Sequence, residues 1–253
     1  MTAASGRAVL VTGASRGIGA AVARGFAAAG DRVAVHYGAA RDAAQDVLAS
    51  LAGSGHLLVG AELGDPEAVR AMVAEAAGGL GGLDVLVNNA GVFRTHPITE
   101  TTYEEWQRAW QDTLAVNLLG AANATWCAVP HMIEAGGGRI VNVSSRGAFR
   151  GEPRSPAYGA SKAAIVALGQ SLARALGPHG IAVTTVAPGW TETDMAADTL
   201  SGPRGDEIRA ESPLGRVAKP ADVARAVLYL ASPGAEMASG TVIDVNGASF
   251  LRM

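Results

Sequence analysis

Apolar and polar positions follow two different periodicities along this chain. Short apolar runs rich in β-branched residues are typical of buried strands. The longer stretches between them repeat their apolar positions every three or four residues, which predicts helices. The predicted strands are residues 8–11, 33–37, 57–61, 85–88, 140–143, 182–186 and 241–245. The predicted helices are residues 18–29, 42–51, 66–77, 104–133, 158–176 and 220–231.

This alternation of strands and helices favours parallel pairing through right-handed crossovers, with helices on both faces of the sheet. No linker-like stretch or repeat divides the chain, so residues 1–253 are predicted to form one doubly wound α/β domain. The least regular part is residues 189–219, where Gly and Pro interrupt polar clusters. Because this excursion follows the carboxyl end of a strand, we interpret it as a substrate lid within the domain.

Composition narrows the function classes further. The formal net charge is −3, and no run of Lys or Arg indicates a nucleic-acid surface. No apolar stretch reaches the roughly 18 residues that a membrane span needs, and the first residues do not resemble a signal peptide. The single cysteine, Cys127, excludes an intrachain disulfide. We therefore expect a cytoplasmic protein with no membrane or nucleic-acid partner, and we predict no metal site.

A glycine-rich turn follows the first predicted strand. Residues 12–19 read Thr-Gly-Ala-Ser-Arg-Gly-Ile-Gly and lead into a predicted helix. Glycines let the backbone approach a diphosphate closely, and the helix N-terminus offers unpaired N–H groups. The position of this turn in the first strand–helix unit predicts a dinucleotide site, with a purely structural turn as the alternative.

A second pattern, Asn88-Asn89-Ala90-Gly91, closes the fourth predicted strand. Small residues at this point would let a cofactor pass close to the backbone. The two Asn amides are suited to tying neighbouring strands together. The alternative interpretation is an ordinary polar strand end.

The third pattern is Tyr158 followed by Lys162. A spacing of four places both side chains on one face of a helix. A phenol titrates near ~10 in water and is a poor acid or base at neutral pH unless a nearby ammonium stabilises the phenolate. With four Tyr and two Lys in 253 residues, this spacing is expected by chance only roughly 0.03 times. Since nearly all other basic residues are Arg, a retained Lys here indicates that a compact ammonium is needed.

Taken together, the glycine turn, Asn-Asn-Ala-Gly, Tyr-x-x-x-Lys and the later Pro188-Gly189 resemble the short-chain dehydrogenase/reductase family, in its compact branch of about 250 residues. The resemblance covers essentially the whole chain. It implies a single Rossmann domain, with a seven-stranded parallel sheet in the order 3-2-1-4-5-6-7.

The resemblance also implies four catalytic residues. Tyr158 would donate a proton to a substrate carbonyl oxygen while hydride arrives from the nicotinamide. Lys162 would lower the pKa of the phenol and hydrogen-bond to the nicotinamide ribose. Ser145, thirteen residues before the tyrosine, would hold the carbonyl oxygen, and Asn117 would anchor a water in a proton relay. Two hydroxyl donors converging on one oxygen would stabilise the charge that develops there.

The cofactor is predicted to be NADP, with NAD as the alternative. NAD-binding proteins usually place an acidic residue at the end of the second strand, whereas this strand ends in His36 and Tyr37. Arg16 and Arg41 are placed to meet a 2′-phosphate, although Arg41 would also suit a solvated helix start. The other residues expected at the cofactor are Gly13, Ser15, Gly17, Ile18, Gly19, Glu62, Leu63, Asn89, Ala90, Gly91, Tyr158, Lys162, Pro188, Gly189, Thr191 and Thr193.

In appearance the chain is most similar to the 3-oxoacyl-carrier-protein reductases of this family, although residues 134–138 and 177–180 lack the basic residues that would meet an acidic carrier protein. Phe149 and Trp190 are predicted to line the substrate pocket together with Ser145, with simple packing as the alternative. Arg146, Arg150 and Arg154 would either meet an anionic group or solubilise the surface.

We therefore expect an NADP-dependent oxidoreductase that acts on a small carbonyl or secondary alcohol. An NAD-dependent alcohol or sugar dehydrogenase is the first alternative, and a nicotinamide-binding sensor without turnover is the second. The family resemblance further implies a homotetramer built on predicted helices 104–133 and 158–176 and on the C-terminal strand.

Overall fold

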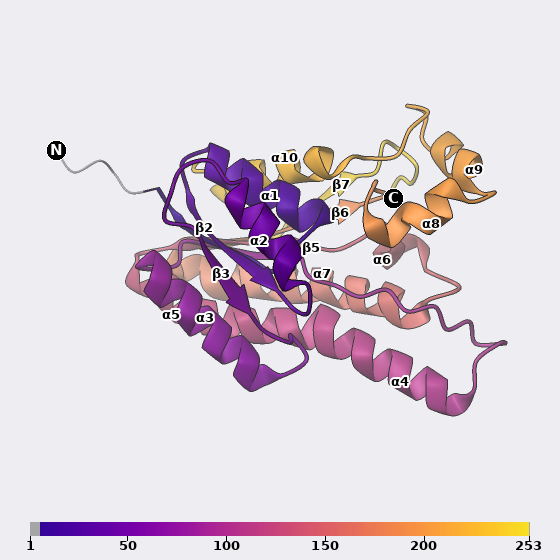
Figure 1. Cartoon of the computed structure of the whole chain (residues 1–253), viewed down its shortest axis with the longest axis horizontal. Coiled ribbons are helices and arrows are strands. Elements are labelled where there is room, and N and C mark those ends of the chain that lie inside the picture. The colour runs from indigo at the N-terminus through magenta and orange to yellow at the C-terminus, as the bar shows by residue number, and fades with distance from the viewer. Residues whose placement is uncertain (1–5, 253) are drawn as a thin grey trace.

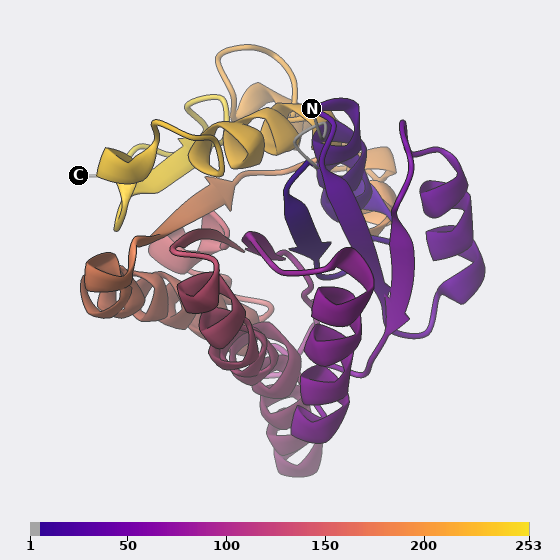
Figure 2. The same ribbon diagram turned by 90° about the vertical axis from the view of Figure 1, so that its left-hand side faces the viewer.

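In a computed structural model, which describes residues 6–252, the chain forms one seven-stranded parallel sheet in the order β3-β2-β1-β4-β5-β6-β7 (Figures 1 and 2). The predicted doubly wound architecture and strand order are confirmed. The strands are β1 Ala8–Val11, β2 Arg32–Tyr37, β3 Leu57–Gly60, β4 Val85–Asn88, β5 Gly138–Val143, β6 Ile181–Pro188 and β7 Val242–Val245.

Helices cover both faces of the sheet (Figure 1). One face packs against α1 (Gly17–Ala28), α2 (Arg41–Ala49) and α10 (Pro220–Leu230), through a core that includes the buried Phe26. The other face packs against α3 (Pro66–Leu80), α5 (Ala121–Glu134) and α7 (Pro156–Leu176). Because the strands are buried from both sides, they read as nearly continuous apolar runs in the sequence.

The prediction of one continuous helix over residues 104–133 is wrong in one respect. The structure divides it into α4 (Tyr103–Leu114), a six-residue π-helical segment (Ala115–Gly120) and α5. Pro130 lies inside α5. π-helical insertions are rare and are found mostly at functional sites, and this one contains Asn117.

The excursion after β6 is more regular than its sequence suggested. It contains two short helices, α8 (Asp194–Ser201) and α9 (Gly205–Ala210), which share a small apolar core of their own with Trp190 packed against it. The remaining short helices are α6 (Gly147–Arg150), the 3₁₀ turn Gly177–His179 and the 3₁₀ turn Glu236–Ala238. Within residues 6–252, no helix combines the length and apolar character needed to cross a bilayer.

All seven strands run in the same direction, so their carboxyl ends lie along one edge of the sheet. The glycine turn follows β1, Asn88 ends β4, Ser145 comes shortly after β5 and Pro188 ends β6. In open parallel sheets, ligands bind in the crevice outside this edge. The fold therefore gathers the sequence patterns at one place.

Candidate active site

The turn after β1 has the geometry of a phosphate cradle. Gly13 adopts a positive φ of 63°, which favours glycine. A Cβ at Gly19 would lie 2.3 Å from the Gly13 carbonyl oxygen and 2.5 Å from the Asn89 amide nitrogen, so only glycine lets α1 approach this closely. No side chain within the described residues caps the first turn of α1, and that turn contains no acidic residue. The unpaired N–H groups and the positive end of the helix dipole suit a diphosphate.

His36, on the neighbouring strand β2, holds this turn in place by a hydrogen bond. Its Nδ1 accepts a hydrogen bond from the Gly13 N–H at 2.9 Å, and its Nε2 lies 3.0 Å from the Ala61 carbonyl oxygen. Burial lowers the pKa of His36, which keeps the ring neutral, with its proton on Nε2. We predicted His36 as a cofactor contact, and the structure gives it a further role as the support of the glycine turn.

The Asn-Asn-Ala-Gly segment joins this turn to the rest of the sheet. The Asn89 amide donates to the carbonyl oxygens of Thr12 and Gly13 at 2.9 and 3.0 Å. The Asn88 amide donates to Asn142 of β5 at 2.9 Å and to Thr125 of α5 at 3.0 Å. The predicted tying of neighbouring strands by these two amides is confirmed.

Gly91 brings the same segment against two of the catalytic candidates. A Cβ there would lie 3.3 Å both from Asn117 Oδ1 and from Lys162 Nζ. The Asn117 side chain accepts from the Val92 N–H at 2.7 Å and donates to the Val92 carbonyl oxygen at 3.0 Å and to Ser161 at 3.1 Å. The Asn117 side chain thus connects the π-helical segment to the loop after β4 and to α7. Its predicted part in a water relay stays a prediction.

Tyr158 and Lys162 lie one turn apart on α7, as their spacing predicted. The Lys162 ammonium nitrogen is 5.8 Å from the centre of the Tyr158 ring and donates to the Val143 carbonyl oxygen at 2.9 Å. Burial lowers the pKa of Lys162 to about 8. Ser145 follows β5 and accepts a hydrogen bond from the Gly147 N–H at 3.0 Å, which fixes its hydroxyl oxygen near the start of α6.

The pKa of Tyr158 lies above the ordinary value of a phenol. Burial raises it to about 12, a hydrogen bond with Ser145 lowers it, and the negative charge of Glu152 raises it. The predicted lowering of this pKa by Lys162 stays a prediction, and the net direction is upward. The reason is that burial disfavours the phenolate more strongly than the polar neighbours favour it. Tyr158 consequently keeps its proton at neutral pH, which is the form that a proton donor requires.

The residues predicted around the adenosine end lie at the tips of β2 and β3. The Tyr37 ring covers Gly60, and the Glu62 carboxylate lies next to Gly38. Leu63 is buried in the core beside α3 and α5. Arg41 is the first residue of α2, and it is exposed.

Arg16, the other arginine predicted to meet a 2′-phosphate, stands immediately before α1 and is also exposed. Its guanidinium lies 3.7 Å from the Asp194 carboxylate at the start of α8. Ser15 and Ile18 are partly buried in the same turn. The segment after β6 and the glycine turn thus meet at Arg16.

The segment after β6 lies against the glycine turn. The Thr193 methyl carbon lies 3.1 Å from the position that a Cβ of residue 17 would take. Thr191 is buried, and its hydroxyl donates to the Gly189 carbonyl oxygen at 3.1 Å. The Pro188 carbonyl oxygen accepts from the Arg146 N–H at 2.8 Å, so this segment also borders the loop that carries Ser145.

An aromatic side chain that we did not predict packs directly against Tyr158. Phe93 approaches the Tyr158 ring edge-on, with 4.9 Å between ring centres, and 39% of it is exposed. The two aromatic residues that we did predict have other neighbours: Phe149 lies under the Arg252 guanidinium at 4.7 Å, and Trp190 packs on the lid core. Phe93 is therefore an aromatic neighbour of Tyr158 that the sequence patterns did not indicate.

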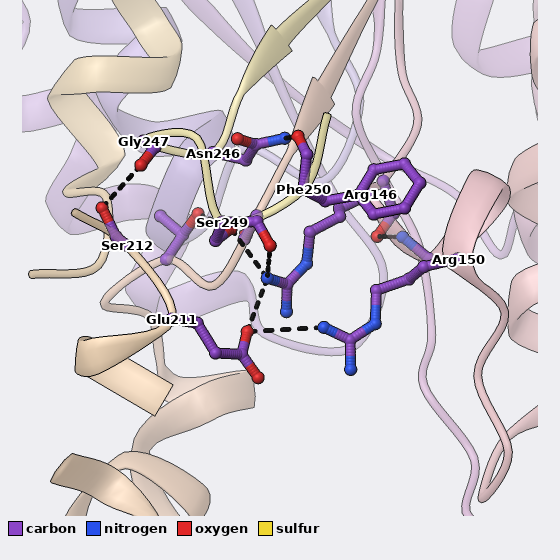
Figure 3. Close-up of polar contacts among 12 residues, drawn as sticks. Arg146, Arg150, Glu211, Ser212, Asn246, Gly247, Ser249 and Phe250 are labelled. Atoms are coloured by element: carbon purple, nitrogen blue, oxygen red, sulfur yellow. Dashed lines mark hydrogen bonds and ion pairs between the residues drawn. The ribbon is translucent and has the colours of Figure 1, made fainter. Parts of the chain in front are cut away.

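The suggestion that Arg146 meets an anionic ligand is wrong. Its side chain is only 5% exposed and donates to Glu211 at 2.6 Å and to the Ser249 hydroxyl at 2.7 Å (Figure 3). Arg150 reaches the same Glu211 carboxylate at 3.4 Å. This network joins the loop after Ser145, the end of α9 and the C-terminal segment. In the same view, the Ser212 hydroxyl donates to the Gly247 carbonyl oxygen at 2.7 Å, a second tie between the lid and the C-terminal segment.

A family model described as enoyl-(acyl carrier protein) reductase matches residues 13–248. With this match and the relatives below, the chain belongs to the short-chain dehydrogenase/reductase family.

Among its relatives is a 3-oxoacyl-[acyl-carrier-protein] reductase, FabG, of Staphylococcus aureus, which is 36% identical over 247 residues, or 97% of this chain and 98% of that protein. A short-chain dehydrogenase from Burkholderia cenocepacia, solved in complex with NADP, has a TM-score of 0.88 and 38% identity and covers 97% of this chain and 98% of that one. A 3-ketoacyl-(acyl-carrier-protein) reductase from Brucella melitensis, complexed with NADH, has a TM-score of 0.87 and 32% identity, with 98% and 99% covered.

Proposed function

We propose that this protein is an NADP-dependent reductase of carbonyl compounds, with 3-oxoacyl groups and related ketones as its substrate class. The observation that carries the proposal is the hydrogen bond between the Ser145 and Tyr158 hydroxyls, with the buried Lys162 ammonium 5.8 Å from the centre of the Tyr158 ring, at the carboxyl edge of the sheet. The glycine turn, whose geometry suits a diphosphate, follows β1 at the same edge. This combination suits hydride transfer to a carbonyl carbon with proton transfer to its oxygen.

The residues of the site divide the work as follows. The nicotinamide, when bound, supplies the hydride. Tyr158 holds the proton that passes to the carbonyl oxygen, and its raised pKa keeps that proton in place until the oxygen becomes basic. Ser145 supplies a second hydroxyl to the same oxygen. Lys162 places a positive charge next to the phenolate as it forms, in surroundings of low dielectric where that charge acts strongly.

NADP is the proposed cofactor because two arginines lie near the expected position of the 2′-phosphate and β2 does not end in an acidic residue. Arg16 and Arg41 are both exposed next to the tips of β1 and β2, and β2 ends in Tyr37. The Burkholderia relative binds NADP, which supports this assignment, whereas the Brucella reductase was solved with NADH. An NAD-dependent alcohol or sugar dehydrogenase is therefore the alternative that the cofactor measurement must exclude.

We further propose that the protein assembles as a cytoplasmic homotetramer. Leu119 and Trp126 support this: they lie one to two turns apart along the π-helical segment and α5, and they are 56% and 73% exposed. Apolar side chains that large are commonly covered in an assembly. Light scattering on the wild-type protein and on Trp126→Glu tests the proposal: a tetramer that dissociates in the variant supports it, and a monomeric wild type overturns it.

The proposed function is tested by NADPH oxidation with a panel of 3-oxoacyl thioesters, cyclic ketones and sugars. Tyr158→Phe is the matched control, because it removes only the phenolic hydroxyl. We expect turnover of at least one ketone class, and a loss of about 100-fold or more in the variant, as removal of a general acid produces. NADPH binding without turnover of any carbonyl, or full activity in Tyr158→Phe, would overturn the proposal.

A further inference from the structure

The N-terminus of α7 carries Tyr158 in its first turn, and this turn lacks the usual cap. Ser155 precedes the helix, but its side chain makes no capping hydrogen bond. The Ser155 hydroxyl is fully buried and has no hydrogen-bond partner within residues 6–252. Helix starts leave several backbone N–H groups unpaired, and a cap side chain usually accepts from one of them. A different residue performs that task here.

That residue is His96, which comes from the loop after β4. Its Nε2 accepts a hydrogen bond from the Ala157 N–H at 3.2 Å, one residue before Tyr158. The backbone N–H of His96 donates to the Arg154 carbonyl oxygen at 2.8 Å, just before the helix. Two hydrogen bonds from one residue therefore fix the point at which α7 begins.

The imidazole of His96 is itself held in one state. The ring is buried, and its Nδ1 lies 2.7 Å from the Arg94 carbonyl oxygen. Because Nε2 accepts from an amide N–H, the ring proton must be on Nδ1, where it donates to that carbonyl oxygen. The ring also packs edge-on against Trp106 of α4, with 5.4 Å between ring centres.

The same loop touches the catalytic residues at two further points. Val92 is bonded through both its N–H and its carbonyl oxygen to the Asn117 side chain. Phe93 packs against the Tyr158 ring. The loop that leaves the cofactor segment at Gly91 thus holds Tyr158 through its ring and through the start of its helix.

From this geometry we propose that His96 is a positioning residue for Tyr158, which caps the catalytic helix through Nε2 and fixes the phenol relative to the cofactor loop. This role rests on the proposed function of Tyr158. It predicts that loss of the acceptor affects the chemical step more than binding, because small displacements of a reacting group lower the rate steeply.

Two variants of matched length test the role of the acceptor. His96→Gln keeps an acceptor oxygen near the position of Nε2, and His96→Met fills similar space without one. We expect kcat for ketone reduction to fall about 10- to 100-fold in His96→Met, while the Kd for NADPH stays within about twofold of wild type. In His96→Gln, we expect kcat to return most of the way to the wild-type value. Equal kcat values in the two variants would overturn the proposal, as would an equal loss in kcat and in NADPH affinity.

A measurement on the wild-type protein needs no variant and no activity. Nitrogen-15 NMR of the His96 side chain should report a protonated Nδ1 and an unprotonated Nε2. A proton on Nε2 would exclude the bond to Ala157 and overturn the proposal. Since this readout does not depend on turnover, a failure of the proposed function and a failure of the His96 role can be told apart.

Discussion

Arg146 and Glu211 form a largely buried ion pair, with 2.6 Å between Nη1 and Oε2, that joins the residue after Ser145 to the end of α9 (Figure 3). The two residues are 65 positions apart in the chain. Arg150 pairs with the same carboxylate from a more exposed position. Comparing the two arginines therefore shows how much burial adds to the strength of the ion pair.

We predict that Glu211→Gln lowers the free energy of unfolding by about 3 kcal/mol, because it leaves the Arg146 charge buried without its partner. Arg150→Met should cost about 1 kcal/mol or less, as expected for a mostly solvated pair. Urea unfolding of the two variants and of Arg146→Met/Glu211→Met measures both effects. The double variant should be more stable than Glu211→Gln. A small loss, equal in Glu211→Gln and Arg150→Met, would show that the pair does not anchor α9.

The cofactor assignment predicts that Arg16→Ala weakens NADPH binding selectively. A charged donor to a phosphate is worth about 1.5–3 kcal/mol, so the Kd for NADPH should rise about 10- to 100-fold while that for NADH stays nearly constant. Fluorescence titration of both cofactors provides the measurement. Asp194→Asn serves as a control, because it frees Arg16 from its ion pair and should leave NADPH binding unchanged or slightly tighter. An equal loss for both cofactors would argue against NADP.

The two pKa values predict the alkaline side of the pH profile for ketone reduction. Reduction needs a protonated Tyr158 and a charged Lys162, whose pKa values lie at about 12 and about 8. Raising the pH removes the Lys162 proton first, so kcat/KM should fall above about pH 8 with an apparent pKa that belongs to the coupled pair. Arg keeps its charge at this pH, so the residual activity of Lys162→Arg should show no such fall. A wild-type profile that stays level to pH 10 would contradict this.

The parallel sheet could be predicted because its inner strands are buried on both faces and appear as apolar runs, as at Leu10 and Ile140, whereas the strand order came from the family resemblance. The glycine turn and the Tyr158–Lys162 spacing were also visible, because local backbone needs and helix periodicity act over a few residues. The π-helical segment around Asn117 was not, because its apolar pattern continues the flanking helices without a break.

The remaining parts of the site depend on contacts between distant segments. His96 carries no local pattern, and its partner Ala157 is 61 positions away. The charge partner of Arg146 is similarly remote. The upward direction of the Tyr158 pKa follows from desolvation of its phenol by the surrounding segments, which the sequence spacing to Lys162 does not encode.

The central claim is that the Lys162 ammonium stabilises the phenolate that Tyr158 becomes as it gives up its proton. It is tested most directly by the single-turnover rate of hydride transfer from saturating NADPH in Lys162→Met. The account predicts a fall of about 100-fold or more, with the fold intact by circular dichroism. Hydride transfer at the wild-type rate in Lys162→Met would contradict it.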